Sequence, residues 1–202
     1  MTYSSAIEFS LNEAHQAANI YLKSETKLFV ETFSQKLSEA FEAGNKLLVC
    51  GNGGSLCDAM HVAEEFTGQF RNKRKALPAI ALADSSHITC VANDMGFDHI
   101  FSRGIEAFGK EGDILLILST SGNSANVIHA LNKAKDLGLY VVCLLGKGGG
   151  ALKNQADLEL IVEGFKYSDR IQEIHMTLMH IVIEAVENLL FYQKNEALAL
   201  NL

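Results

Sequence analysis

Five short apolar runs, each followed by a pattern of helical period or by a polar loop, constrain the fold of this chain more than any other feature. The runs occupy residues 46–50, 79–83, 114–118, 140–145 and 158–162. Runs of this length that are apolar throughout are typical of strands buried on both faces. Strands that alternate with helices require right-handed crossovers, which place helices on both faces of a parallel sheet. The sequence therefore predicts an α/β fold with a five-stranded parallel sheet flanked by helices.

Helical periodicity fills the segments around these runs. It covers residues 56–70, 86–105 with an interruption near 93–96, 124–137, and about 169–191. Residues 5–44 are helical by the same criterion, with a predicted break at Ser24-Glu25 and a predicted stop at Gly44. We expect one domain over residues 1–202, made of an N-terminal helical arm at 1–44 and an α/β core at 45–202. Such an arm packs on its own sheet or on a neighbouring subunit.

Charge and composition exclude several classes of partner. The net charge of −7 argues against nucleic acid or an anionic membrane surface as the main partner. The N-terminus lacks the pattern of a signal peptide, and no apolar run approaches the ~18 residues that span a membrane. The four cysteines show no C-x-x-C spacing, and Cys50 and Cys143 lie in apolar runs. We therefore expect a cytoplasmic protein whose thiols are buried and reduced.

The turn after the third apolar run is the first candidate for a ligand site. It reads STSGNS over residues 119–124 and offers the hydroxyls of Ser119, Thr120, Ser121 and Ser124 at the start of a helix. Hydroxyls, free backbone N–H groups and the positive end of a helix dipole together suit a phosphate. The turn has no lysine, so it is not a nucleotide P-loop. An ordinary strand–helix connection with turn and cap residues explains the same pattern equally well.

The glycine-rich turn CGNGGS at residues 50–55 follows the first apolar run. Its glycines allow a close approach of the backbone to a ligand, and Asn52 and Ser55 add hydrogen-bonding groups. The pattern lacks the last glycine of a dinucleotide-binding motif, because Leu56 stands there. A tight turn without any ligand explains it equally well. In parallel sheets, however, ligands bind beyond the carboxyl ends of the strands. This turn, the STSGNS turn and the GKGGG loop at residues 146–150 all follow such ends.

Three further segments carry side chains that suit chemistry. His61 and Glu65 are four residues apart, which puts them on one helix face within reach of a common metal ion or substrate; a solvated surface pair is the commoner arrangement. Asn93-Asp94 interrupts a helical pattern and indicates a turn or a site that recognises hydroxyls. Asp169 and Gln172 have the spacing of a capping box at the start of the last helix.

Histidines 175 and 180 lie among apolar positions of that last helix. A histidine on an apolar helix face is more often a core residue, with its hydrogen bonds satisfied, than a ligand.

Together these motifs resemble one family. CGNGGS, His61-x-x-x-Glu65, AND at 92–94, STSGNSANV at 119–127 and DRIQEIHMTLMH at 169–180 stand in the order and spacing of the phosphoheptose isomerases. These are small proteins of the sugar-isomerase (SIS) domain group with a flavodoxin-like fold. The resemblance covers nearly the whole chain. It implies a cytoplasmic homotetramer that interconverts sedoheptulose 7-phosphate and D-glycero-D-manno-heptose 7-phosphate, at the start of the route to the heptose of bacterial lipopolysaccharide.

The resemblance also implies roles for individual residues. Glu65 and His180 match the catalytic pair. A zinc site, one per subunit, matches His61, Glu65, Gln172 and His180. The substrate contacts match Asn52, Gly53, Gly54, Ser55, Glu65, Asn93, Asp94, Ser119, Thr120, Ser121, Ser124 and Gln172. The chain departs from the family where a basic residue is expected after Thr67-Gly68, since Gln69 stands there and Arg71 is the next basic residue.

The implied chemistry suits these residue types. Aldose–ketose isomerisation moves a proton between C1 and C2 through an enediol, which requires a base, an acid and an anchor for the phosphate. A divalent metal could polarise the carbonyl. Gln172 and His180 are eight residues apart, which on a straight helix is ~12 Å along the axis and ~80° around it. We therefore predict either that the site is completed across a subunit boundary or that the helix is irregular at its start.

Two other classes of function remain as alternatives. A non-enzymatic SIS protein that binds the bacterial replication initiator resembles this chain in the glycine turn and in the RIQE segment at residues 170–173. A regulator that senses sugar phosphates is the second alternative, but the chain has no basic helix-turn-helix and its N-terminal arm is acidic. The presence of His61, Glu65 and His180 together favours the enzyme.

Overall fold

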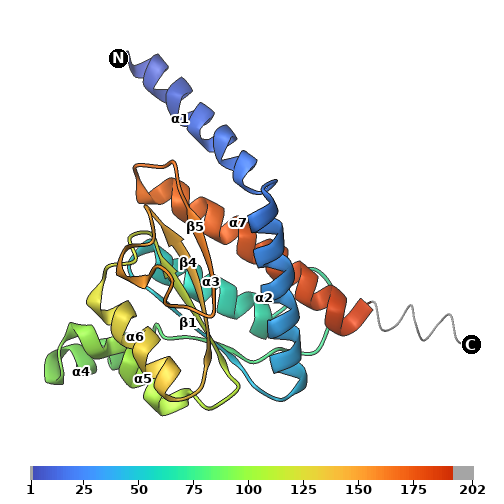
Figure 1. Ribbon diagram of the computed structural model, residues 1–202, viewed down its shortest axis with the longest axis vertical. Helices are drawn as coiled ribbons and strands as arrows, with labels where there is room; N and C mark the ends of the chain where they lie inside the picture. Colours follow the sequence, from blue (N-terminus) through green and yellow to red (C-terminus); the bar gives the residue numbers. More distant parts are fainter. Residues whose placement is uncertain (1, 193–202) are drawn as a thin grey trace, which may run out of the picture.

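Across residues 2–192, which the computed structural model describes, the chain forms a five-stranded parallel sheet in the order β2-β1-β3-β4-β5 (Figure 1). All neighbouring strands pair in parallel register. The strands are β1 (Leu47–Gly51), β2 (Ala79–Ala81), β3 (Ile114–Ser119), β4 (Tyr140–Gly146) and β5 (Leu158–Val162). Each of the five apolar runs therefore forms a strand, and the predicted fold class is confirmed.

Helices cover both faces of the sheet (Figure 1). One hydrophobic core lies between the sheet and the first set of helices, and a second core lies between the sheet and the other set. The first set is α2 (Ser24–Glu42), α3 (Gly54–Thr67) and α7 (Ser168–Glu187). The second set is α4 (Ser85–Asp94), α5 (Ile100–Phe108) and α6 (Ala125–Asp136). β3 is buried along its whole length, as its uninterrupted apolar sequence requires.

Short helical turns connect these elements. Three are 3₁₀ turns, at Ala18–Ile20, Phe97–His99 and Gly150–Leu152, and a π-helical turn at Asn188–Tyr192 follows α7. The predicted interruption near residues 93–96 corresponds to the end of α4 and the 3₁₀ turn that precedes α5.

The N-terminal arm has two parts with different surroundings. α2 packs against α7 and contributes to the core, whereas α1 (Tyr3–Ala17) extends away from the sheet (Figure 1). Most apolar side chains of α1, including Phe9 and Leu11, are exposed. The predicted break at Ser24-Glu25 is confirmed, because α2 begins at Ser24. α2 ends at Glu42, and Gly44, which has a positive φ, follows as the predicted stop. The core of the fold therefore takes in α2 and the last residue of α1, Ala17, whereas most of α1 lies off the sheet.

The start of α7 corrects one prediction. The helix begins at Ser168, and its N-cap residue is Tyr167, whose side chain makes no capping hydrogen bond in the described chain. Asp169 thus lies inside the first turn, where its carboxylate accepts a hydrogen bond from the Arg170 N–H. Gln172 points to another residue, Ser55, rather than back to the cap. The predicted capping box is wrong because the helix begins before Asp169. α7 is a continuous α-helix from its start, so the predicted alternative of an irregular start is also wrong.

The four cysteines divide into a buried pair and an exposed pair. Cys50 and Cys143 are buried, and burial raises the pKa of the Cys143 thiol to about 12. Cys57 and Cys90 are exposed, so the prediction of buried thiols is wrong for these two, which lie on outer helix faces.

The segment Ser168–Tyr192 is long and apolar enough to cross a membrane by composition, but much of it lies in the core of the fold. The apolar composition of α7 is thus accounted for in part by its place in the core.

Candidate active site

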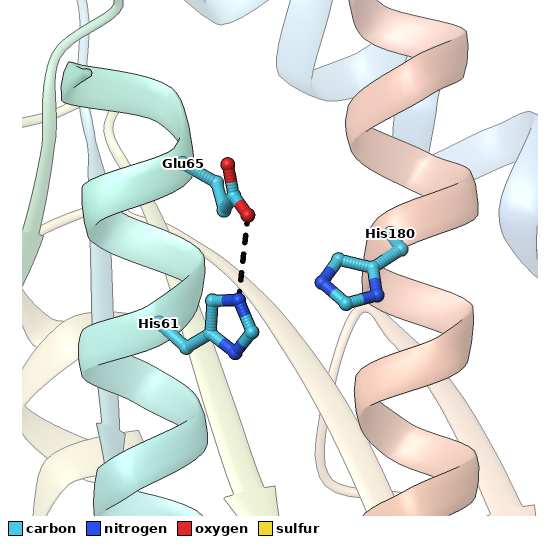
Figure 2. Close-up of side chains that lie close together, drawn as sticks. All are labelled: His61, Glu65 and His180. Carbon is cyan, nitrogen blue, oxygen red and sulfur yellow. Dashed lines mark ion pairs between the residues drawn. The ribbon is translucent and has the colours of Figure 1, made fainter. Parts of the chain in front are cut away.

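His61, Glu65 and His180 converge between two neighbouring helices (Figure 2). His61 and Glu65 project from α3, one turn apart, and His180 projects toward them from α7. The potential ligand atoms of the three side chains lie within 4.8 Å of one another. His61 Nε2 is 3.3 Å from Glu65 Oε1, and the two imidazole rings are 5.0 Å apart at their centroids. The packing of α3 against α7 on one face of the sheet creates this cluster.

The cluster is partly shielded from solvent. The Glu65 side chain is 16% exposed and the His61 side chain 43% exposed. The Phe70 ring stacks on His180, with centroids 5.7 Å apart. Burial and, to a smaller extent, the nearby His61 lower the pKa of His180, while Glu65 acts in the opposite direction. The lowered pKa favours the neutral ring, which can bind a metal through one nitrogen and donate a proton through the N–H of the other.

The two histidines of α7 have different roles in the structure. His175 is fully buried, and its Nε2 lies 3.1 Å from the carbonyl oxygen of Leu145. Burial lowers its pKa to about 4. The expected core position is confirmed for His175, although its Nδ1 is buried without a hydrogen-bond partner within residues 2–192. The same expectation is wrong for His180, which faces α3 at the cluster.

The donor set of the cluster fits a zinc ion. Two imidazole nitrogens and one carboxylate oxygen form the set that some catalytic zinc sites use, with a fourth position left for water or substrate. All three donors come from one chain. The fourth ligand that the resemblance implies, Gln172, lies two turns earlier on α7, where its Nε2 is 3.4 Å from Ser55 Oγ. Within one chain, the structure thus brings three of the four implied ligands together.

The STSGNS turn uses some of its hydroxyls internally. Ser119 Oγ accepts a hydrogen bond from the Gly122 N–H at 3.0 Å, and Ser121 Oγ accepts one from the Asn123 N–H at 3.3 Å. Ser124 is the N-cap residue of α6, yet its side chain makes no capping hydrogen bond within residues 2–192. The ordinary role of a turn therefore accounts for two of the four hydroxyls. The Ser124 hydroxyl and the start of α6 form a polar site that the turn itself does not require.

A lysine from the next loop approaches this turn. Thr120 Oγ1 donates a hydrogen bond to Ser168 Oγ at 3.1 Å, and Lys147 Nζ donates one to the same oxygen at 3.2 Å. Lys147 belongs to the GKGGG loop after β4. The sequence analysis placed the GKGGG loop at the same edge of the sheet as STSGNS but assigned no role to Lys147 or Ser168. The approach follows from the strand order, because the neighbouring parallel strands β3 and β4 place the loops after them side by side.

The glycine turn lies beside the starts of α6 and α7. Asn52 and Asn126 exchange two amide hydrogen bonds of 2.8 Å, which fix this turn to α6. A Cβ atom at Gly54 would lie 2.7 Å from the amide of Gln172, so any larger residue here would displace that amide from its present position. The glycine turn that carries Asn52 and Ser55 thus lies at the carboxyl edge of the sheet, where Ser55 meets Gln172. Sequence reasoning missed Asn126.

Asn93 and Asp94 lie apart from these groups. Both are exposed at the end of α4, where the Asn93 amide donates to the Asp94 carboxylate at 2.7 Å. α4 packs on α5, and both belong to the face of the sheet opposite α3 and α7. Within one chain, the structure does not bring these two residues to the His61–Glu65–His180 cluster.

Known proteins match this chain along most of its length. The family model of the SIS domain matches residues 15–146. A phosphoheptose isomerase of Fusobacterium nucleatum is 60% identical over 161 residues, which are 80% of this chain and 82% of that protein. One of an Enterobacter species is 50% identical over 92% of this chain and 97% of its own. The chain belongs to the phosphoheptose isomerase family. A solved phosphoheptose isomerase structure from Francisella tularensis has a TM-score of 0.88 at 35% identity, and the match covers 93% of this chain and 100% of that one.

Family membership confirms the resemblance that the motifs indicated. The family consists of aldose–ketose isomerases, so the comparisons favour the enzyme over the non-enzymatic initiator-binding protein. The two matches with curated relatives and the structural match all cover more than three quarters of each partner's length.

The segment after α3 departs from the pattern that this family predicts. Gln69 stands where a basic residue is expected, and Arg71 is the next basic residue. The Arg71 guanidinium lies 5.3 Å from the centroid of the Phe70 ring and forms an ion pair with Glu184 of α7. Arg71 thus contacts the same Phe70 ring that stacks on His180. The side chain of a second arginine, Arg74, is almost completely buried, where it forms an ion pair with Glu187 of α7. The sequence analysis missed Arg74 because a basic residue in a loop is usually exposed.

Proposed function

We propose that this chain converts sedoheptulose 7-phosphate to D-glycero-D-manno-heptose 7-phosphate. The observation that carries the proposal is the convergence of Glu65, His61 and His180 between α3 and α7, in a chain of the phosphoheptose isomerase family. A carboxylate beside an imidazole supplies a base and an acid for a proton shift between neighbouring carbons. The polar turns at the carboxyl edge of the same sheet supply an anchor for the phosphate.

The proton shift proceeds in two balanced steps. The Glu65 carboxylate takes a proton from C1 of the ketose, and the electron pair of that C–H bond forms the C1–C2 double bond. The C2 carbonyl oxygen receives a proton from His180, which gives the enediol. In the second step the C1 hydroxyl gives its proton to His180, C1 becomes the carbonyl carbon, and the electron pair of the C1–C2 double bond takes the proton back from Glu65 at C2. His180 thus serves the oxygen atoms and Glu65 the carbon atoms.

A zinc ion, one per subunit, is part of the proposal. His61, Glu65 and His180 would hold it, with Gln172 as the fourth ligand that the family pattern implies. When bound, a divalent ion polarises the carbonyl and stabilises negative charge on the enediolate oxygens. A carboxylate held tightly by a metal ion would be a weak base, so Glu65 could serve as both ligand and base only if that coordination were loose.

The phosphate anchor is proposed at the STSGNS turn. Ser119, Thr120, Ser121 and Ser124 would contact it through hydroxyls and backbone N–H groups, and Lys147 adds a positive charge near Thr120. Asn52, Gly53, Gly54 and Ser55 border the same edge of the sheet. Asn93 and Asp94 would contact the sugar only if a neighbouring subunit presents them.

A homotetramer with shared active sites is the proposed assembly. Three observations support it: Gln172 lies two turns away from His180, Asn93 and Asp94 lie on the far face of the sheet, and α1 exposes apolar side chains. We place the enzyme in the cytoplasm, as a single domain, at the start of heptose synthesis for lipopolysaccharide.

A direct assay tests the function. The purified protein is incubated with sedoheptulose 7-phosphate, and formation of the aldose is followed by a coupled enzyme and by NMR of the anomeric protons. We expect turnover that disappears after dialysis against a chelator and returns with Zn²⁺. Absence of turnover with and without Zn²⁺, together with retention of the replication initiator in a pull-down, would establish the non-enzymatic alternative instead.

A further inference from the structure

A buried ion pair joins the segment after α3 to the end of α7. Arg74 Nε donates to Glu187 Oε1 at 2.7 Å, and the two side chains are only 1% and 2% exposed. Burial of two charges carries a desolvation cost, and apolar residues of similar volume are often equally stable at such a position. Stability alone is therefore a weak reason for this pair, and its other contacts indicate a second role.

The remaining donors of Arg74 hold the last turn of α3. Nη2 donates to the backbone carbonyl of Glu65 at 2.6 Å, and Nη1 donates to those of Phe66 at 2.7 Å and Gly68 at 3.1 Å. The last carbonyls of a helix lack partners within the helix, and a cation near them is favourable. One planar guanidinium thus binds the peptide group of Glu65 and, through Glu187, the helix that carries His180.

The position of Glu187 along α7 makes this contact relevant to the cluster. Glu187 follows His180 by about two helical turns, which places both residues on nearly the same face of α7, toward α3. The spacing and rotation of α7 relative to α3 therefore set the distance between His180 and Glu65. A misplacement of about 1 Å between catalytic groups can lower a rate by about 10²-fold.

We propose that Arg74 is a positioning residue, which fixes the backbone of Glu65 on α3 relative to His180 on α7 through Glu187. This inference rests on the proposed isomerase function. It assigns no contact with substrate to Arg74. Geometry predicts that loss of the guanidinium disturbs the catalytic step and the metal site more than it disturbs binding of the phosphate, because the proposed phosphate anchor is the STSGNS turn before α6.

Three variants separate positioning from stability. Arg74→Lys keeps the charge, but a single ammonium cannot bind Glu187 and the two helix carbonyls in one planar arrangement. Arg74→Met combined with Glu187→Met removes both buried charges and is expected to keep the melting temperature close to wild type. Glu187→Gln keeps an acceptor oxygen for Arg74. The control Arg103→Lys changes an exposed ion pair of similar chemistry on α5, on the opposite face of the sheet.

The readouts are kcat, KM, melting temperature and affinity for Co²⁺, measured by its absorption spectrum. We expect Arg74→Lys and the double Met variant to lose ~10-fold or more in kcat with KM within about twofold of wild type. Their Co²⁺ affinity should fall ~10–100-fold, as it does when a residue that orients a ligand is changed. Glu187→Gln should lose much less, and Arg103→Lys should match wild type in every readout.

Several results would overturn the assignment. Wild-type kcat and Co²⁺ affinity in a folded Arg74→Lys or double Met variant would do so. A loss of kcat that merely follows the fraction of unfolded protein would also overturn the assignment. Failure of both variants to fold would do the same, because Arg74 would then contribute to stability rather than to positioning. If the wild-type protein fails to isomerise the sugar, the proposed function is wrong, and the Co²⁺ affinities alone decide on Arg74.

Discussion

At the scale of single residues, His175 and His180 show what a helical period leaves open. Both lie at apolar positions of α7, five residues apart, and the sequence pattern treats them alike. The structure turns His175 toward β4 and His180 toward α3. Which face of a helix meets which neighbour depends on long-range packing, so the pattern alone could not separate the core histidine from the one in the cluster. The pattern did identify the His61–Glu65 spacing, because both residues lie on one turn.

Buried His175 predicts a pH dependence of stability. Its pKa in the folded protein is about 4, below the usual 6.5 of the unfolded chain, because burial disfavours the charged ring. The unfolded state therefore binds the proton first, and the free energy of unfolding should fall as pH decreases from about 6.5 to about 4, by on the order of 3 kcal/mol.

Urea unfolding of wild type and His175→Gln between pH 7 and pH 4 measures this effect. The glutamine can still donate a hydrogen bond to the Leu145 carbonyl but does not titrate. We expect a smaller loss of stability in the variant over this range. Equal losses in both proteins would contradict the assignment.

Ser121 provides a prediction for the phosphate anchor. A hydrogen bond to a charged group contributes roughly 1.5–3 kcal/mol, so Ser121→Ala should weaken substrate binding about tenfold or more. The fold should be retained, since the hydroxyl makes only a 3.3 Å contact within its own turn. Steady-state kinetics with sedoheptulose 7-phosphate measure the effect. If KM and kcat both equal the wild-type values, the phosphate lies elsewhere.

At the scale of elements, the strands and most helix bounds could be predicted from the sequence, whereas contacts between loops could not. Apolar runs bounded by polar turns determine strands locally, so all five were found. The approach of Lys147 to Ser168 depends on the order of strands in the sheet, which no local pattern contains. The same is true of Arg74, whose partner Glu187 lies 113 residues away along the chain.

Contact between two of these loops gives a prediction at this scale. Gly122 has φ +62°, and a Cβ atom there would lie 1.9 Å from the carbonyl oxygen of Gly149. Gly122→Ala therefore combines an unfavourable left-handed conformation, about 1–2 kcal/mol, with a clash between backbones. We expect its melting temperature to fall by several degrees or more.

Gly148→Ala is the matched control for Gly122→Ala. Gly148 also has a positive φ, but a Cβ atom there would contact nothing within 4 Å. Its melting temperature should fall less than that of Gly122→Ala when both are measured by calorimetry. Equal falls would show that the STSGNS and GKGGG loops are not packed as the structure has them.

At the scale of the whole molecule, the separation of the site residues is the feature that most requires explanation. The His61–Glu65–His180 cluster lies in the later turns of α3, whereas Gln172 and Ser55 meet at the carboxyl edge of the sheet. The sequence predicted this separation from the eight residues between Gln172 and His180. It could not show which neighbouring chain completes each site, because that depends on assembly.

Mixed oligomers test the shared site. Glu65→Gln and Gln172→Ala subunits with different affinity tags are co-expressed, and hybrids that carry both tags are purified. Each variant alone should be nearly inactive. If one site combines the cluster of one subunit with Gln172 of another, some sites in the hybrid are intact and activity returns. Hybrids as inactive as the parents would place all site residues in one chain, and an active Gln172→Ala parent would exclude Gln172 from the site.

The most direct test of the account is the turnover of Glu65→Gln and His180→Gln. Glu65 is proposed to move the proton at carbon and His180 the proton at oxygen, while the phosphate is held by turns on other strands. Both variants should fold, assemble and bind sugar phosphate, yet lose ~10²–10⁴ in kcat. Measured kcat and melting temperature decide the matter together. A Glu65→Gln enzyme with wild-type kcat, or a His180→Gln variant that loses only stability, would contradict the proposed mechanism.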